Sequence, residues 1–136
     1  MYKWIDGQWC EVADYIPRQL SYGNKQACVY LAIEETYQQE GKGTSPLVKV
    51  GLTRGMGFRR GSLFSVYGVR TVREIPTSDK HLEHIEADLI NWLHNAPTAQ
   101  RRSTETAYID GSVVDLMVQA FESLVKTLEH YYESAD

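Results

Sequence analysis

The chain has 136 residues, which is the usual size of one domain and enough for a single hydrophobic core. Apolar residues make up 43% and charged residues 24%, and no apolar run approaches the ~20 residues of a membrane span, so the composition excludes the disordered and membrane-spanning classes. A net charge of −4 argues, at first sight, against a nucleic-acid partner.

The N-terminal segment is predicted to form a β-hairpin. Two short apolar segments, Tyr2–Ile5 and Gln8–Val12, flank Asp6-Gly7, and Asp-Gly between such segments is the strongest short-range hairpin signal. Residues 14–24 are ambiguous, because Pro17 and Gly23 limit any helix there.

A second pair of strands is predicted at Cys28–Ile33 and Leu47–Thr53. Residues 34–46 between them are polar and contain two glycines and a proline, so we expect a loop. The two strands are therefore expected to pair as an antiparallel hairpin with a long connection.

The second half of the chain alternates between helices and strands. A glycine-rich basic segment contains a short predicted helix around Phe58–Leu63, and Val69–Ile75 alternates as a strand does. A helix over Lys80–His94 follows the N-cap candidates Thr77-Ser78-Asp79, and Thr106–Ile109 reads as a short strand. Ser112 to Asp115 resembles a capping box that opens a final amphipathic helix.

The order of these elements is typical of an α+β fold, with a small mixed or antiparallel three-stranded sheet flanked by helices. We expect residues 1–136 to form a single domain in three parts. These are an N-terminal hairpin extension (1–26), a core (27–110) and a C-terminal helix (111–136).

Two polar side chains stand out on the central strands because period two separates the faces of a strand. Tyr30 and Lys49 each lie among small neighbours on the face opposite the aliphatic residues. They could face a shared hollow. The alternative is an amphipathic hairpin with Tyr30 half-exposed and Lys49 in solvent.

Glu86 falls inside the apolar arc of the helix predicted at Lys80–His94. A carboxylate on a buried face costs several kcal/mol unless it is paired or binds a metal. A lone Glu suits Mg²⁺, which keeps several waters and often takes one or two protein carboxylates. The alternatives are an ion pair with Arg59, Arg60 or Arg73, or a carboxylate that reaches the rim.

Basic residues are concentrated in one segment. Residues 42–73 contain seven Lys and Arg residues and no acid, whereas residues 74–136 hold twelve acids and four bases. Such a segment can focus positive potential on one surface, and arginine suits phosphate because its planar fork offers paired donors. A solvated basic loop explains the charge equally well.

Four motifs together resemble the GIY-YIG nuclease superfamily. The chain has Val29-Tyr30, Val50-Gly51, an Arg eight residues later (Arg59) and a Glu on a later helix (Glu86), in the order of that superfamily. It looks most like the phage-type subclass whose second motif reads Lys-Ile/Val-Gly, here Lys49-Val50-Gly51. Arg101-Arg102 followed by Glu105-Thr106-Ala107-Tyr108 is also similar to that subclass.

The resemblance implies a GIY-YIG-like core over residues 27–110 that hydrolyses DNA phosphodiester bonds with Mg²⁺ or Mn²⁺. Tyr30 would be the general base, which acts as a phenolate, and Lys49 the cation that favours the phenolate. Arg59 would stabilise the transition state and Glu86 would be the metal ligand. Further arginines would contact phosphates: Arg54, Arg60, Arg70, Arg73, Arg101 and Arg102.

A second interpretation is a GIY-YIG-like module without catalysis that binds nucleic acid or a protein partner. It is favoured by Lys49 in place of the second Tyr, by Leu63 four residues after Arg59, and by the acidic C-terminal half. In a third, the basic segment of an accessory protein contacts an acidic protein surface. Cutting both strands with one site per chain would favour a homodimer.

We expect a cytoplasmic location. The N-terminus lacks the apolar stretch of a secretion signal. The two cysteines, Cys10 and Cys28, permit one disulfide bond without implying one, so reduced thiols are the default.

Overall fold

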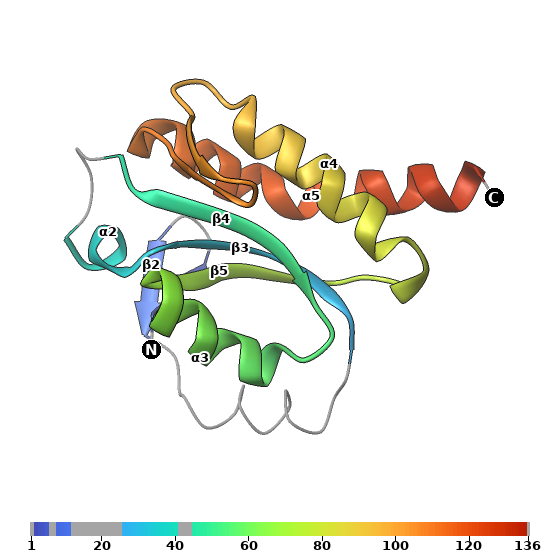
Figure 1. The fold of residues 1–136 in the computed structure, drawn as a ribbon, viewed down its shortest axis with the longest axis horizontal. Helices are drawn as coiled ribbons and strands as arrows, with labels where there is room; N and C mark the ends of the chain where they lie inside the picture. The colour runs from blue at the N-terminus through green and yellow to red at the C-terminus, as the bar shows by residue number, and fades with distance from the viewer. Residues whose placement is uncertain (1, 6–7, 12–25, 41–44, 136) are drawn as a thin grey trace.

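The computed structural model describes residues 2–5, 8–11, 26–40 and 45–135. Within them the fold is α+β, as predicted, with a five-stranded antiparallel sheet and a separate two-stranded hairpin (Figure 1). The ambiguous segment 14–24 lies outside the described residues. None of the helices in the described ranges is long and apolar enough to cross a bilayer.

The main sheet has the strand order β5-β3-β4-β7-β6. Its strands are β3 (Cys28–Glu34), β4 (Leu47–Thr53), β5 (Val69–Pro76), β6 (Gln100–Ser103) and β7 (Thr106–Tyr108). The expected hairpin of β3 and β4 is confirmed, with Tyr30 opposite Gly51 and Ala32 opposite Lys49.

The prediction of three strands in the sheet is wrong, because β7 and β6 extend it beyond β4. Of these two, the sequence indicates only the shorter, β7. Strand β6 is not predicted because its sequence, Gln-Arg-Arg-Ser, has no apolar alternation, and all of its residues are exposed. Only pairing with β7 makes it a strand.

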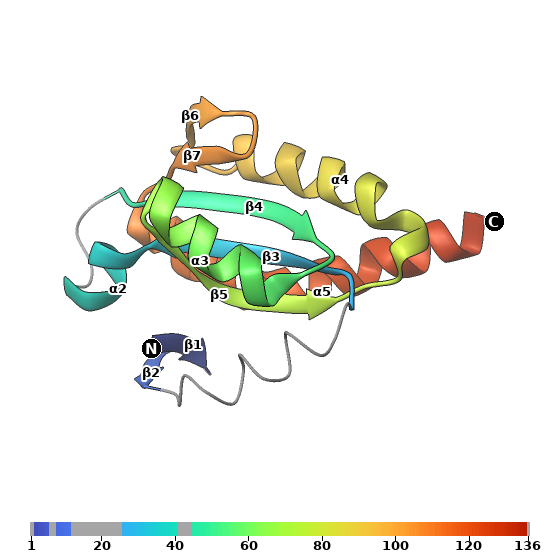
Figure 2. The same ribbon diagram turned by 60° about the horizontal axis from the view of Figure 1, so that its bottom comes forward.

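Helices cover both faces of the sheet (Figures 1 and 2). On one face α4 (Leu82–His94) and the long α5 (Gly111–Ala135) enclose the main core. This core takes the aliphatic positions of the central strands: Val29, Leu31, Ile33, Val48 and Val50. On the other face α3 (Met56–Tyr67) covers a smaller cluster that includes Tyr30 and Leu63.

Two helices differ from the predicted elements. The loop expected at 34–46 contains α2 (Glu35–Glu40), which Tyr37 ties to α5 by a hydrogen bond to the carbonyl of Gly111 at 3.3 Å. Helix α3 extends beyond both ends of the predicted Phe58–Leu63 helix. It stops at Gly68, whose positive φ of 68° suits glycine and whose N–H caps the helix.

The N-termini of α4 and α5 differ in detail from the predicted helix starts. Ser78 is an N-cap, as expected, but it caps a short 3₁₀ turn, η1 (Asp79–His81), that precedes α4. The capping box predicted at Ser112 is wrong, because α5 begins earlier. The carboxylate of Asp110 accepts hydrogen bonds from the N–H (2.9 Å) and the hydroxyl (2.6 Å) of Ser112.

The predicted N-terminal hairpin is confirmed as β1 (Tyr2–Ile5) and β2 (Gln8–Glu11), in antiparallel register with Trp4 opposite Trp9. It forms a two-stranded sheet of its own, apart from the main sheet.

Gly51 leaves room for the ring of Tyr30. A Cβ atom added at Gly51 would lie 2.6 Å from Cζ of Tyr30 and closer still to its hydroxyl. The ring has no space to retreat, because Tyr30 is fully buried beneath α3. A glycine at position 51 is therefore a packing requirement of Tyr30.

We predict opposite effects for two Gly-to-Ala changes. Gly51→Ala should destabilise the protein by about 1–3 kcal/mol through overpacking against Tyr30. Gly61→Ala should be neutral or stabilise by up to about 1 kcal/mol, because that position is inside α3 and its added Cβ would meet no atom within 4 Å. Urea denaturation of both variants is the measurement, and equal effects would contradict the packing argument.

Candidate active site

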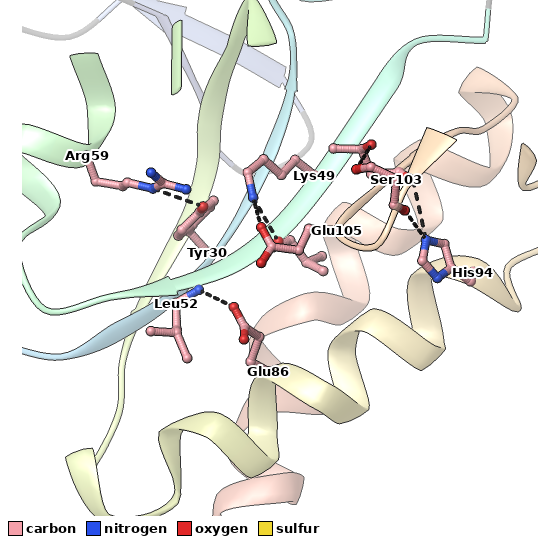
Figure 3. Close-up of polar contacts among 10 residues, drawn as sticks. Tyr30, Lys49, Leu52, Arg59, Glu86, His94, Ser103 and Glu105 are labelled. Carbon is pink, nitrogen blue, oxygen red and sulfur yellow. Dashed lines mark hydrogen bonds and ion pairs between the residues drawn. The ribbon is translucent and has the colours of Figure 1, made fainter. Parts of the chain in front are cut away.

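Four predicted site residues come from four elements and lie around one polar region (Figure 3). Tyr30 is on β3, Lys49 on β4, Arg59 on α3 and Glu86 on α4. A fifth residue, the charged Glu105, joins them from the turn between β6 and β7. We define these five residues as the candidate site.

Tyr30 and Arg59 are in direct contact. The Nε–H of Arg59 donates to the phenol oxygen of Tyr30 at 3.4 Å, a long hydrogen bond. The ring of Tyr30 is fully buried, while Arg59 is partly exposed and can be reached by a ligand. The pair thus links a buried hydroxyl to a cation at the surface.

Lys49 is fully buried, which excludes the alternative of a lysine in solvent. Its ammonium forms an ion pair with the carboxylate of Glu105. It also lies 5.6 Å from the ring centre of Tyr30 and 5.1 Å from that of Tyr67, within the range of cation–π attraction. The charge is therefore compensated by one carboxylate and two aromatic rings.

Sequence reasoning misses the role of Glu105. The N–H of Val50 donates to its carbonyl at 3.2 Å, which fixes the turn on the edge of β4. His94 on α4 holds the same hairpin, with Nε2 at 3.0 Å from the carbonyl oxygen of Ser103 (Figure 3). The available signal was indirect: if Lys49 faces a hollow, which was one of the two alternatives, its burial requires a carboxylate partner.

Glu86 reaches the site around the edge of the sheet. Strand β7 pairs with β4 only from Leu47 to Lys49, so the edge of β4 beyond Lys49 is not covered by a strand. There the carboxylate of Glu86 accepts a hydrogen bond from the N–H of Leu52 at 3.1 Å. This explains why a glutamate is found in the apolar arc of α4. Glu86 lies on the helix face that packs on the sheet, and its carboxylate is hydrogen-bonded to the open edge of β4.

The environment of Glu86 disfavours its charge. Burial raises the pKa of this carboxyl, and the neighbouring Glu105 carboxylate raises it further. The N–H of Leu52 and the ammonium of Lys49 act in the opposite direction without cancelling the rise. No ion-pair partner of Glu86 is found within the described ranges, so the predicted pairing with Arg59, Arg60 or Arg73 is not formed.

A divalent cation suits the two carboxylates chemically. Glu86 and Glu105 supply hard oxygen ligands, and a cation would relieve the repulsion that raises the pKa of Glu86. In the part of the chain that the structure describes, no three His, Cys, Asp or Glu residues gather into a metal site. A cation here would therefore rely on water and substrate oxygens for most of its ligands.

The other predicted phosphate-binding arginines do not gather at this site. Three of them pair with carboxylates: Arg54 with Asp79 and Glu83, Arg60 with Glu74, and Arg70 with Glu35. Arg73 donates to the carbonyl of Val72 at 2.9 Å, and Arg101 and Arg102 are exposed on β6. A role in nucleic-acid binding remains a prediction for all six.

Comparison with known proteins gives no relative: no family model, no curated protein and no solved structure matches this chain.

We predict that removing Glu105 costs more stability than removing Lys49. Glu105→Ala would leave a buried ammonium without its carboxylate and should destabilise by about 2 kcal/mol. Lys49→Met removes the buried charge at similar volume and should change stability by less than about 1 kcal/mol. Chemical denaturation at neutral pH measures both, and an equal loss in the two variants would contradict this account.

We also predict that Glu86→Gln stabilises the protein at neutral pH. Because the pKa of Glu86 is raised on folding, its ionised form costs stability above the folded pKa, and the cost disappears as pH falls toward the unfolded value. The gain in melting temperature should therefore shrink near pH ~4, the ordinary range of a Glu carboxyl.

Glu83 provides the matched control on the same helix. Its hydrogen bond from Arg54 lowers its pKa, so Glu83→Gln should slightly destabilise at neutral pH, and this loss should fade in acid. Changes of the same sign in Glu83→Gln and Glu86→Gln would show that the environment of Glu86 is not the cause.

Proposed function

We propose that the protein is a divalent-metal-dependent DNA endonuclease of the GIY-YIG type. One observation carries the proposal: Tyr30, Arg59 and Glu86, which the sequence singles out by motif order and by their places on a strand and a helix, come from three elements and lie around one region together with Lys49. Perturbed carboxylates in such a setting are typical of functional sites.

In this proposal Tyr30 takes a proton from the attacking water, a step for which its buried phenol must become accessible to solvent. Arg59 already donates to its phenol oxygen, and such a donor stabilises negative charge on that oxygen. Lys49 adds a second cation 5.6 Å from the ring, although Glu105 partly offsets it. The guanidinium of Arg59, partly exposed, can also contact the phosphate and stabilise charge that develops in the transition state.

Glu86 is the residue that would hold Mg²⁺ or Mn²⁺. When bound, the cation would stabilise negative charge on the leaving oxygen. The hydrogen bond from Leu52 fixes one carboxylate oxygen, Oε2, at the sheet edge. Glu105 is close enough to raise the pKa of Glu86 and is a candidate second ligand through its Oε1, because Lys49 pairs with its Oε2.

The second candidate is a module of the same type that binds DNA or a protein without cutting. The ion pair of Lys49 with Glu105 favours it, because it neutralises the cation that would assist Tyr30. The position four residues after Arg59 favours it too, since Leu63 is a fully buried core residue with no catalytic group.

Plasmid cleavage with Mg²⁺ or Mn²⁺ tests the proposal. We expect the wild type to nick DNA and EDTA to stop it. Tyr30→Phe and Glu86→Gln should each reduce the rate by 10²-fold or more, the order expected for losing a general base or a metal ligand. Arg59→Ala should have a comparable effect through the transition state.

Glu83→Gln is the control, because this exposed carboxylate lies on the same helix and should leave cleavage unchanged. Salt-sensitive DNA binding without cleavage by the wild type would favour the binding module. Cleavage that survives both Tyr30→Phe and Glu86→Gln would rule out this site as its source.

A further inference from the structure

We propose that a hollow beside the candidate site binds an unstacked nucleobase. Most of its lining residues come from the start of α2, the end of α3 and the β6–β7 hairpin. These elements lie at the same end of the sheet (Figure 2). The volume of the hollow is about 330 Å³, within the range of small-molecule sites. Its polar and aromatic lining residues include Glu34, Thr36, Phe64, Tyr67, Arg102 and Tyr108. The inference rests on the proposed function in taking a nucleic acid as the ligand.

Aromatic rings from two elements line this hollow. Phe64 and Tyr108 are 39% and 36% exposed, so part of each ring can be reached from solvent, and Tyr67 lines the hollow beside them. Arginines lie over two of these rings, with Arg70 4.1 Å from the ring centre of Phe64 and Arg102 5.9 Å from that of Tyr108. Rings and guanidinium planes are the groups on which proteins stack unpaired bases.

The polar groups of the hollow favour a base with an exocyclic amino group. The carboxylate of Glu34 accepts hydrogen bonds from the N–H of Leu47 at 2.8 Å and from the hydroxyl of Thr36 at 3.2 Å. Its two oxygens have about four acceptor positions, so at least one remains for a donor on a ligand. Adenine, cytosine and guanine supply such a donor as an exocyclic amino group, whereas the N3–H donor of thymine is flanked by two carbonyl oxygens that a carboxylate repels. The negative charge of Glu34 also disfavours a phosphate inside the hollow.

The hollow is separated from Lys49 of the candidate site by the ring of Tyr67. Tyr67 lines it, and the ring of the same residue lies 5.1 Å from the ammonium of Lys49. Leu47, another lining residue, precedes Lys49 by two positions and therefore shares its face of β4. A base held here would lie one aromatic ring away from Lys49 of the candidate site. Because a paired base must first leave its stack, we infer that DNA with an unpaired nucleotide is preferred over intact duplex.

Binding of short single-stranded DNA, measured by fluorescence anisotropy without metal, tests this inference. The probes are an oligo-dA of about 12 nucleotides, the matching oligo-dT, and an abasic strand of equal length. Tyr108→Ala and Phe64→Ala should each weaken oligo-dA binding about 10-fold, because the stacking face is lost. Neither should change binding of the abasic strand. Glu34→Gln should reduce the preference for oligo-dA over oligo-dT.

Control variants distinguish loss of the stacking surface from loss of the folded structure. Tyr131→Ala removes another exposed aromatic ring, on α5, and should have no effect. Tyr108→Trp keeps a stacking face and should retain affinity. Equal binding of oligo-dA by the wild type and by both Ala variants, or no binding by the wild type, would overturn the inference.

The two proposals can fail separately. If cleavage requires Tyr30 and Glu86 but binding does not depend on a base at Tyr108, the nucleobase site is ruled out and the nuclease proposal stands. If binding depends on a base at Tyr108 and Phe64 but no cleavage occurs, the nucleobase site stands and the nuclease proposal is ruled out.

Discussion

The buried charge of Lys49 is the constraint on which the site depends. An ammonium with no exposure to water is stable only if a carboxylate lies against it, and the chain supplies Glu105 from 56 residues away. The β6–β7 hairpin must therefore sit where its turn reaches β4, and His94 and the pairing of β7 keep it there. Because β7 pairs only as far as Lys49, the next part of β4 stays open, and Glu86 occupies that edge.

This edge brings together groups from opposite faces of the sheet. Arg59 belongs to α3 on one face and Glu86 to α4 on the other, and neither helix crosses the sheet. A full-length β7 would pair with the N–H of Leu52 and remove the hydrogen bond that places Glu86. The shortness of β7 is thus a functional feature of the fold in our proposal.

The sequence predicts the elements that repeat a simple pattern. Period two identifies β3, β4 and β5 and the face that Tyr30 and Lys49 share, and helical period identifies the unusual place of Glu86. It fails for β6, whose polar residues become a strand only through a partner, and for α2, which depends on Tyr37 reaching α5. The role of Glu105 could not be predicted in this way, because it depends on a contact with Lys49, 56 residues away, that no local sequence pattern indicates.

The fit between Tyr30 and Gly51 has a consequence for how this protein can change over evolution. The ring of one residue fills the space that a side chain at the other would need, so the two positions cannot vary independently. A smaller residue at position 30 would leave a void that a side chain at 51 could fill. Once Tyr30 is replaced by a smaller residue, Gly51 can also be replaced, so Tyr30 and Gly51 should be conserved together or replaced together. Among related sequences, a side chain at position 51 would mark a chain whose phenol is gone.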